Sequence, residues 1–129
     1  MNLQNLAYAL DQSLHNLGAV MVTGGSFLAL FDEIRRKELA WLVLSGWTIQ
    51  GVTGALFGIL SYAFYHHLPD IAGIAVGALV IKMVCAAIGF LLAAVFLKKA
   101  ATASIVFWRI EAFLAFLALT SAAFLRWFS

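Results

Sequence analysis

The chain has 129 residues, of which 64% are hydrophobic and 11% are charged, and its formal net charge is +2. Soluble domains carry about 25% charged residues, and one domain of this length cannot bury so much apolar side chain, which excludes an ordinary soluble globular protein and indicates lipid as the solvent. The small net charge gives no indication of nucleic acid as a partner, and the single cysteine, Cys85, excludes an internal disulfide and any cysteine-rich zinc or iron–sulfur site.

Four apolar segments follow one another along the chain, and each exceeds the roughly 20 residues that a helix needs to cross a bilayer. The four predicted spans are residues 6–31, 39–65, 71–97 and 105–128. A charged turn at 32–38, a proline-containing turn at 66–70 and a turn that begins with Lys98 and Lys99 separate them. The N-terminus lacks a basic region before a short apolar core, so we expect the first span to be retained rather than cleaved as a signal peptide.

Short turns predict an up-down-up-down antiparallel arrangement, so the expected fold is an all-α integral membrane domain, a bundle of four transmembrane helices covering residues 1–129. The basic residues concentrate in the first and third turns, at Arg35, Arg36, Lys37, Lys98 and Lys99. The positive-inside rule makes these turns cytoplasmic. We therefore expect a multi-pass protein of the inner membrane with both termini on the outer, periplasmic side.

Tryptophans lie toward the ends of the predicted spans, as expected for an aromatic belt at the two membrane interfaces. They are Trp41, Trp47, Trp108 and Trp127.

His15 is the most informative polar residue of the first span. Gly18, Val22 and Gly25 follow it at offsets of three, seven and ten, which places the imidazole and two glycines on one helical stripe. Such glycines allow close approach by another helix or by the flat face of a macrocycle. Asp11, one turn earlier, is a candidate to orient the second ring nitrogen of His15. The alternative is an interface histidine bonded to a neighbouring helix.

The turn histidines His66 and His67 are expected on the same side of the membrane as His15, and Lys82 at a depth similar to that of His15. His66 and His67 stand in the second turn, where one of them is a candidate second ligand and an ordinary hydrated turn is the alternative. Lys82 lies about eleven residues, or about 16 Å, into the third span. A charge at that depth costs roughly 2.5–3.5 kcal/mol on insertion scales, which indicates a function. We expect Lys82 to face His15 across one cavity, as a haem ligand or proton carrier; snorkelling is the alternative.

Soft metal ligands are few. Met21, Met83 and Cys85 are copper ligands in principle, and together with His15 they define a copper pathway as an alternative to haem. Gly54 and Gly58 form a GxxxG pair in the second span, which is typical of helix packing.

The first-span sequence LHNLGAVMVTGG, residues 14–25, resembles the first-helix pattern of the CopD-type copper-resistance membrane domain. Matching features follow on the later spans, at Lys82, at the basic end Lys98-Lys99 and at the Arg109-Ile110-Glu111 opening of the last helix. The resemblance covers about residues 12–127. It implies a four-helix membrane domain associated with copper handling.

A histidine on helix one with a lysine on helix three is also similar to the HemJ-type protoporphyrinogen oxidases, membrane proteins that hold haem b. This likeness implies His15 and Lys82 as axial ligands of the haem iron. Residues 24–27, GGSF, stand where that family has a sequence containing Pro-Arg, so we expect a redox subunit rather than an enzyme in its own right.

Together these features predict a CopD-like membrane protein that binds haem b and passes electrons between a quinol or a periplasmic carrier and a partner. Two alternatives stay open, a structural subunit of a larger respiratory complex and copper transport or delivery. A homodimer is one way to close the cavity, with the glycines of the second span as a candidate interface.

Overall fold

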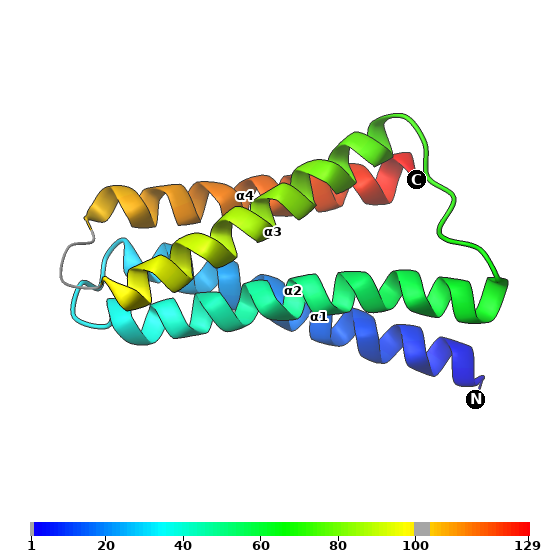
Figure 1. Ribbon diagram of the computed structural model, residues 1–129, viewed down its shortest axis with the longest axis horizontal. Helices are drawn as coiled ribbons and strands as arrows, with labels where there is room; N and C mark the ends of the chain where they lie inside the picture. Colours follow the sequence, from blue (N-terminus) through cyan, green and yellow to red (C-terminus); the bar gives the residue numbers. More distant parts are fainter. Residues whose placement is uncertain (1, 100–103) are drawn as a thin grey trace.

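In a computed structural model, which describes residues 2–99 and 104–129, the chain forms four helices and, within those ranges, no strand. The helices are α1 (Leu3–Ala29), α2 (Arg36–Tyr65), α3 (Ile74–Lys98) and α4 (Ile105–Phe128). Figure 1 shows successive helices running in opposite directions, with the start of α1 and the end of α4 at the same end of the molecule. The expected all-α class is confirmed.

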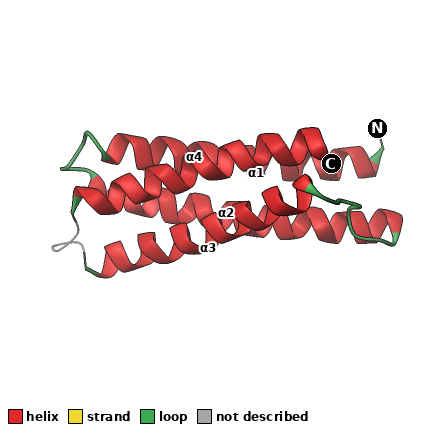
Figure 2. Ribbon diagram, turned by 90° about the horizontal axis from the view of Figure 1, so that it is seen from above, coloured by secondary structure: helices red, strands yellow, loops and turns green. Residues whose placement is uncertain are grey.

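The four helices surround a common interior. Each helix contacts its neighbour in the chain, α1 also contacts α4, and the contacts are most extensive within the hairpins α1–α2 and α3–α4. Figure 2 shows the same arrangement from above. It follows that α1 lies diagonally opposite α3, and α2 diagonally opposite α4.

Among the described residues, three helices, α2, α3 and α4, are long and apolar enough to cross a membrane. This agrees with the expected multi-pass protein. α1 has sufficient length, at 27 residues, but its first half carries many polar side chains, including Asp11, Gln12 and Asn16. The fourth span therefore stays a prediction.

Local hydrogen bonds explain why α1 and α2 deviate from the predicted limits. α1 begins at Leu3 rather than at residue 6, because the Asn2 side chain accepts a hydrogen bond from the Gln4 N–H at 3.0 Å and caps the helix. It ends at Ala29, whose carbonyl accepts a hydrogen bond from the Arg36 side chain at 2.9 Å. α2 begins at this arginine, so the predicted charged turn is shorter than expected.

The second turn ends α2 at Tyr65, as predicted, because His66 adopts the left-handed conformation at φ 59°. α3 begins at Ile74 rather than at residue 71, since Gly73 has φ +59° and interrupts the helical backbone before it. In the predicted third turn, Lys98 belongs to α3, and residues 100–103 lie outside the described residues.

α1 and α2 approach each other closely at three glycines. A Cβ on Gly18 would lie 2.8 Å from Ile49 Cγ2, one on Gly25 would lie 2.8 Å from Val43 Cγ2, and one on Gly46 would lie 2.7 Å from Val22 Cγ2. Real Cβ atoms do not approach other atoms this closely. Side chains of α2 therefore already occupy the space beside Gly18 and Gly25, which the sequence offered to a macrocycle. By contrast, a Cβ added to Gly54 or Gly58, the GxxxG pair of the second span, would meet no atom within 4 Å.

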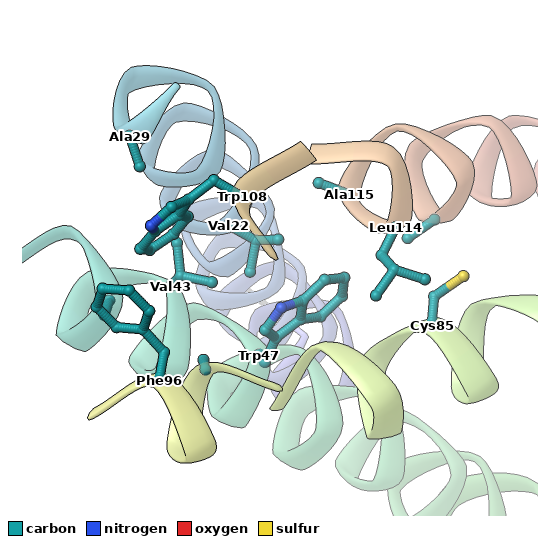
Figure 3. Packing of buried hydrophobic residues seen from close by; sticks show 12 residues of the cluster. Val22, Ala29, Val43, Trp47, Cys85, Phe96, Trp108, Leu114 and Ala115 are labelled. Atoms are coloured by element: carbon teal, nitrogen blue, oxygen red, sulfur yellow. The ribbon is translucent and has the colours of Figure 1, made fainter. Parts of the chain in front are cut away.

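The largest buried side chains are aromatic and lie toward the end of the bundle where α2 and α4 begin. Figure 3 shows Trp47, Trp108 and Phe96 packed between the helices. The ring centroids of Phe96 and Trp108 lie 5.0 Å apart in an edge-to-face arrangement. Trp47 and Trp108 are 3% and 0% exposed, so the prediction of an aromatic belt is wrong for these two, while Trp41 and Trp127 are exposed.

Candidate functional site

The structure brings His15 of α1 and Lys82 of α3 into direct contact, with Nε2 of the histidine 2.7 Å from Nζ of the lysine. These residues are 67 positions apart in the chain and lie on diagonally opposite helices, so their side chains meet across the interior of the bundle. Both are half-buried. The expected cavity between them is absent in this arrangement, because the two nitrogens are within hydrogen-bonding distance.

Thr53 of α2 fixes the orientation of the imidazole. Its Oγ1 lies 2.6 Å from Nδ1 of His15 and donates a hydrogen bond to the carbonyl of Ile49 at 2.6 Å. Since the hydroxyl proton is used in that bond, Oγ1 accepts the proton of His15 Nδ1. The remaining ring nitrogen, Nε2, then carries the lone pair and accepts a hydrogen bond from Lys82. The partner of Nδ1 is therefore Thr53, and not Asp11 as expected.

Gln50 adds a second contact from the same face of α2. Its side-chain amide donates a hydrogen bond to the main-chain carbonyl of His15 at 2.5 Å, and the residue is only 8% exposed. Gln50 and Thr53 are three residues apart, so both reach α1 from one side of α2. The sequence reasoning missed Gln50; the available signal was an amide in an otherwise apolar span, three residues before a threonine.

No carboxylate balances Lys82 in the part of the chain that the structure describes. Ion pairs join Arg35 with Asp32 and Arg36 with Glu33, both near the first turn, and neither pair involves Lys82. The short contact with His15 is thus the main polar interaction that the structure gives the lysine amine.

The donor chemistry of the pair fits a metal-bearing cofactor at His15. A neutral imidazole with one nitrogen held by a hydrogen-bond partner and the other free to bind is the usual state of a ligating histidine. Two nitrogens that hold a metal ion from opposite sides lie about 4 Å apart, because each metal–nitrogen bond is about 2 Å long, so at 2.7 Å His15 and Lys82 do not hold one between them. Lys82 therefore covers the ligand atom of His15 in this arrangement.

The other predicted site residues lie elsewhere or serve packing. Gly18 and Gly25 contact α2. His66 ends α2, and His67 is exposed with its Nδ1 2.8 Å from the Leu68 carbonyl. From Thr53, which marks the level of His15, the end of α2 is about 18 Å away at 1.5 Å per residue, so the structure does not bring the turn histidines to the pair.

Copper ligands are not gathered in one place. Within residues 2–99 and 104–129, no group of three or more His, Cys, Asp or Glu side chains is placed to hold a metal ion. Met83 is 62% exposed while Cys85 is 2% exposed, so the two face different sides of α3.

A second polar contact, which the sequence reasoning missed, crosses the other diagonal of the bundle. Trp47 of α2 donates a hydrogen bond from Nε1 to Oε2 of Glu111 of α4 at 3.0 Å. Glu111 is fully buried, and its Oε1 has no hydrogen-bond partner in the described structure. Nε1 of Trp108 and Oγ of Ser26 are likewise buried without a hydrogen-bond partner there. The signal in the sequence was the acid Glu111 inside an otherwise apolar span, because a buried carboxyl needs a hydrogen-bond donor.

No protein-family model, curated protein or solved structure matches this chain. The likeness to the CopD-type and HemJ-type domains accordingly stays a prediction, and a functional interpretation rests on the geometry described above.

Proposed function

We propose that this chain is a multi-pass inner-membrane protein in which His15 and Lys82 hold one b-type haem and which transfers electrons as a redox subunit. The observation that carries the proposal is the contact of His15 with Lys82 across the bundle, with Thr53 fixing the free nitrogen of the imidazole toward the lysine. Two nitrogen donors from facing helices are a common way for a four-helix bundle to hold a cofactor.

The surface of the bundle supports the membrane part of the proposal. Large apolar side chains are exposed on all four helices, including Leu17, Val52, Leu91 and Phe113, each more than half exposed. Soluble proteins rarely expose so many large apolar side chains on every helix. With α1 as the fourth span, the basic first and third turns lie in the cytoplasm and both termini lie outside.

This topology predicts which turns an impermeant thiol reagent reaches. Cys85 is the single cysteine of the chain, so a Cys85→Ala background has no thiol. Glu33 in the first turn and His67 in the second are exposed, so Glu33→Cys and His67→Cys each add one accessible thiol to that background. Labelling of intact spheroplasts is expected to modify the position-67 variant and to spare the position-33 variant until the membrane is opened. The reverse pattern would contradict the orientation, and labelling of both in intact spheroplasts would contradict a spanning bundle.

Thr53 holds the proton on Nδ1 of His15, so in the proposed site the imidazole would offer Nε2 to the iron as a neutral ligand in one orientation. Lys82, whose amine contacts Nε2 of His15 in the structure, would hold the haem from the other side. The haem would supply one-electron chemistry at a potential set by these ligands and by the apolar surroundings.

The arrangement of the helices supports a position for the proposed haem between the hairpins α1–α2 and α3–α4. The contacts within α1–α2 and within α3–α4 are more extensive than those between the hairpins, and His15 and Lys82 stand on different hairpins. Room for a ring is therefore easier to make between the hairpins than inside α1–α2, where the neighbouring helix already fills the space beside Gly18, Gly25 and Gly46.

Reduction by a quinol tests the electron-transfer part of the proposal. Haem-loaded protein in proteoliposomes is expected to be reduced by a membrane-soluble quinol such as duroquinol, and to be reoxidised by a soluble high-potential acceptor. Protein that dithionite reduces but that stays oxidised with both a quinol and a soluble reduced carrier would contradict electron transfer while leaving haem binding in place.

A further inference from the structure

The outward face of α1 carries a line of polar side chains, Asn5, Gln12, Asn16 and Thr23, which we call the polar stripe. The spacings of seven, four and seven residues place them on one side of the helix. Asn5, Gln12 and Asn16 are exposed, and Thr23 is partly buried. The residues of α1 that the bundle buries lie on another side, at Asp11, Gly18, Val22, Gly25, Ser26 and Ala29. Neither α2 nor α4 therefore covers the polar stripe.

The polar stripe is nearly as long as the hydrocarbon core of a membrane is thick. From Asn5 to Thr23 it extends over about 27 Å at 1.5 Å per residue, close to the roughly 30 Å of the hydrocarbon core. In the proposed first span, which begins at residue 6, Gln12, Asn16 and Thr23 would face lipid tails, which offer no hydrogen-bond partner, and each unsatisfied polar group there is costly.

Hydrogen bonds inside the chain satisfy only part of this demand. Gln12 donates from Nε2 to Oδ1 of Asn16 at 2.8 Å, and this is the bond between side chains of the stripe that the described structure contains. A glutamine and an asparagine each have two N–H donors and an oxygen with two lone pairs. Each amide thus keeps donors and acceptors that point away from the bundle.

We propose that the polar stripe is the contact surface for a second copy of this chain, with α1 packed against α1 of the partner. A two-fold axis along the membrane normal places identical residues at identical depths. Amides both donate and accept, so Gln12 and Asn16 can pair with their own counterparts, and the stripe carries no charge that would call for an oppositely charged partner. Ala9, which lies between Asn5 and Gln12 on the same side, allows close approach. The proposal rests on the membrane insertion of α1 proposed above and does not depend on haem.

Disulfide cross-linking at two adjacent positions tests the proposal in native membranes. Ala9 lies on the stripe, and Leu10, which is also exposed, points about 100° away from it. In a Cys85→Ala background, Ala9→Cys is expected to form a covalent dimer on mild oxidation, whereas Leu10→Cys at nearly the same depth is expected to remain monomeric. Equal cross-linking of both, or of neither, would overturn the proposal, as would a product whose mass identifies a different protein.

Energy transfer between labelled copies in proteoliposomes measures how strongly the stripe holds them. Gln12→Leu combined with Asn16→Leu removes up to four interhelical partners per dimer and is expected to weaken self-association at least about tenfold. Thr120→Leu, an exposed polar residue of α4 bonded to its own helix, is the matched control and is expected to leave self-association unchanged. Wild-type protein without energy transfer, or a double variant with undiminished transfer, would overturn the proposal. Haem content and resistance to carbonate extraction, measured on the same samples, separate this outcome from a failure of the haem or membrane proposals.

Discussion

Replacing His15 with alanine is expected to abolish haem binding, with a loss of affinity of more than about 100-fold. His15 offers the one imidazole nitrogen that the structure orients toward a partner across the bundle, whereas His66 and His67 stand in a turn at the end of α2. Even partners that only orient a ligand change metal affinity about 10- to 100-fold, so removal of the ligand itself exceeds that range. Titration of the purified apoprotein with haemin, followed in the Soret band, measures the effect.

Thr53→Val is the graded companion of that variant. It keeps the shape of the side chain and removes the oxygen that accepts the proton of His15 Nδ1. Affinity is expected to fall about 10- to 100-fold, with stoichiometric haem restored at high concentration. A His15→Ala protein that still binds one haem per chain would refute the assignment, and a Thr53→Val protein with unchanged affinity would refute the role of the threonine.

Gly89→Val is expected to destabilise the bundle by about 2–6 kcal/mol. A Cβ on Gly89 would overlap the indole ring of Trp47, so the ring must move and its hydrogen bond to Glu111 is broken. Overfilling a packed core costs about 1–3 kcal/mol. A buried carboxyl left without its partner costs about 1–3 kcal/mol more. Unfolding in mixed detergent micelles, followed by tryptophan fluorescence and helical circular dichroism, measures the change.

Gly77→Val on the same helix provides the control. A Cβ on Gly77 meets nothing within 4 Å, so this variant tests the same change of residue type in α3 without the clash. Its stability is expected to stay within about 0.5 kcal/mol of the wild type, as for surface positions in general. Equal destabilisation of both variants would show that the packing of Trp47 against Gly89 is not the cause.

The sequence predicted the four helices and the meeting of His15 with Lys82 for a physical reason. Apolar runs between charged turns determine where helices begin and end to within a few residues, and short turns determine their order. Counting residues from the turns then gives the depth of each side chain along its helix. Depth was sufficient to place the histidine and the lysine at the same level on helices that start at the same end.

The rotation of each helix about its own axis was harder to predict, and most of the missed contacts depend on it. Gln50, Thr53 and Glu111 act through the faces that α2 and α4 turn inward, which packing against Gly18, Gly46 and Gly89 decides. The position of Trp47 and Trp108 along their helices is readable from sequence and predicts them at the membrane interfaces, whereas the rotation that buries them is not readable. Local capping by Asn2 and the positive φ of Gly73 account for the shifted helix ends.

The most direct test of the proposed function is the haem content of the wild-type protein. The protein would be expressed with haem supply, purified in mild detergent and examined oxidised and dithionite-reduced, with a pyridine haemochrome assay against protein concentration. The proposal predicts one haem b per chain and sharp reduced α and β bands, typical of an iron with two axial ligands. A colourless protein would contradict it, and metal analysis of the same sample would then decide between copper handling and a structural subunit without a cofactor.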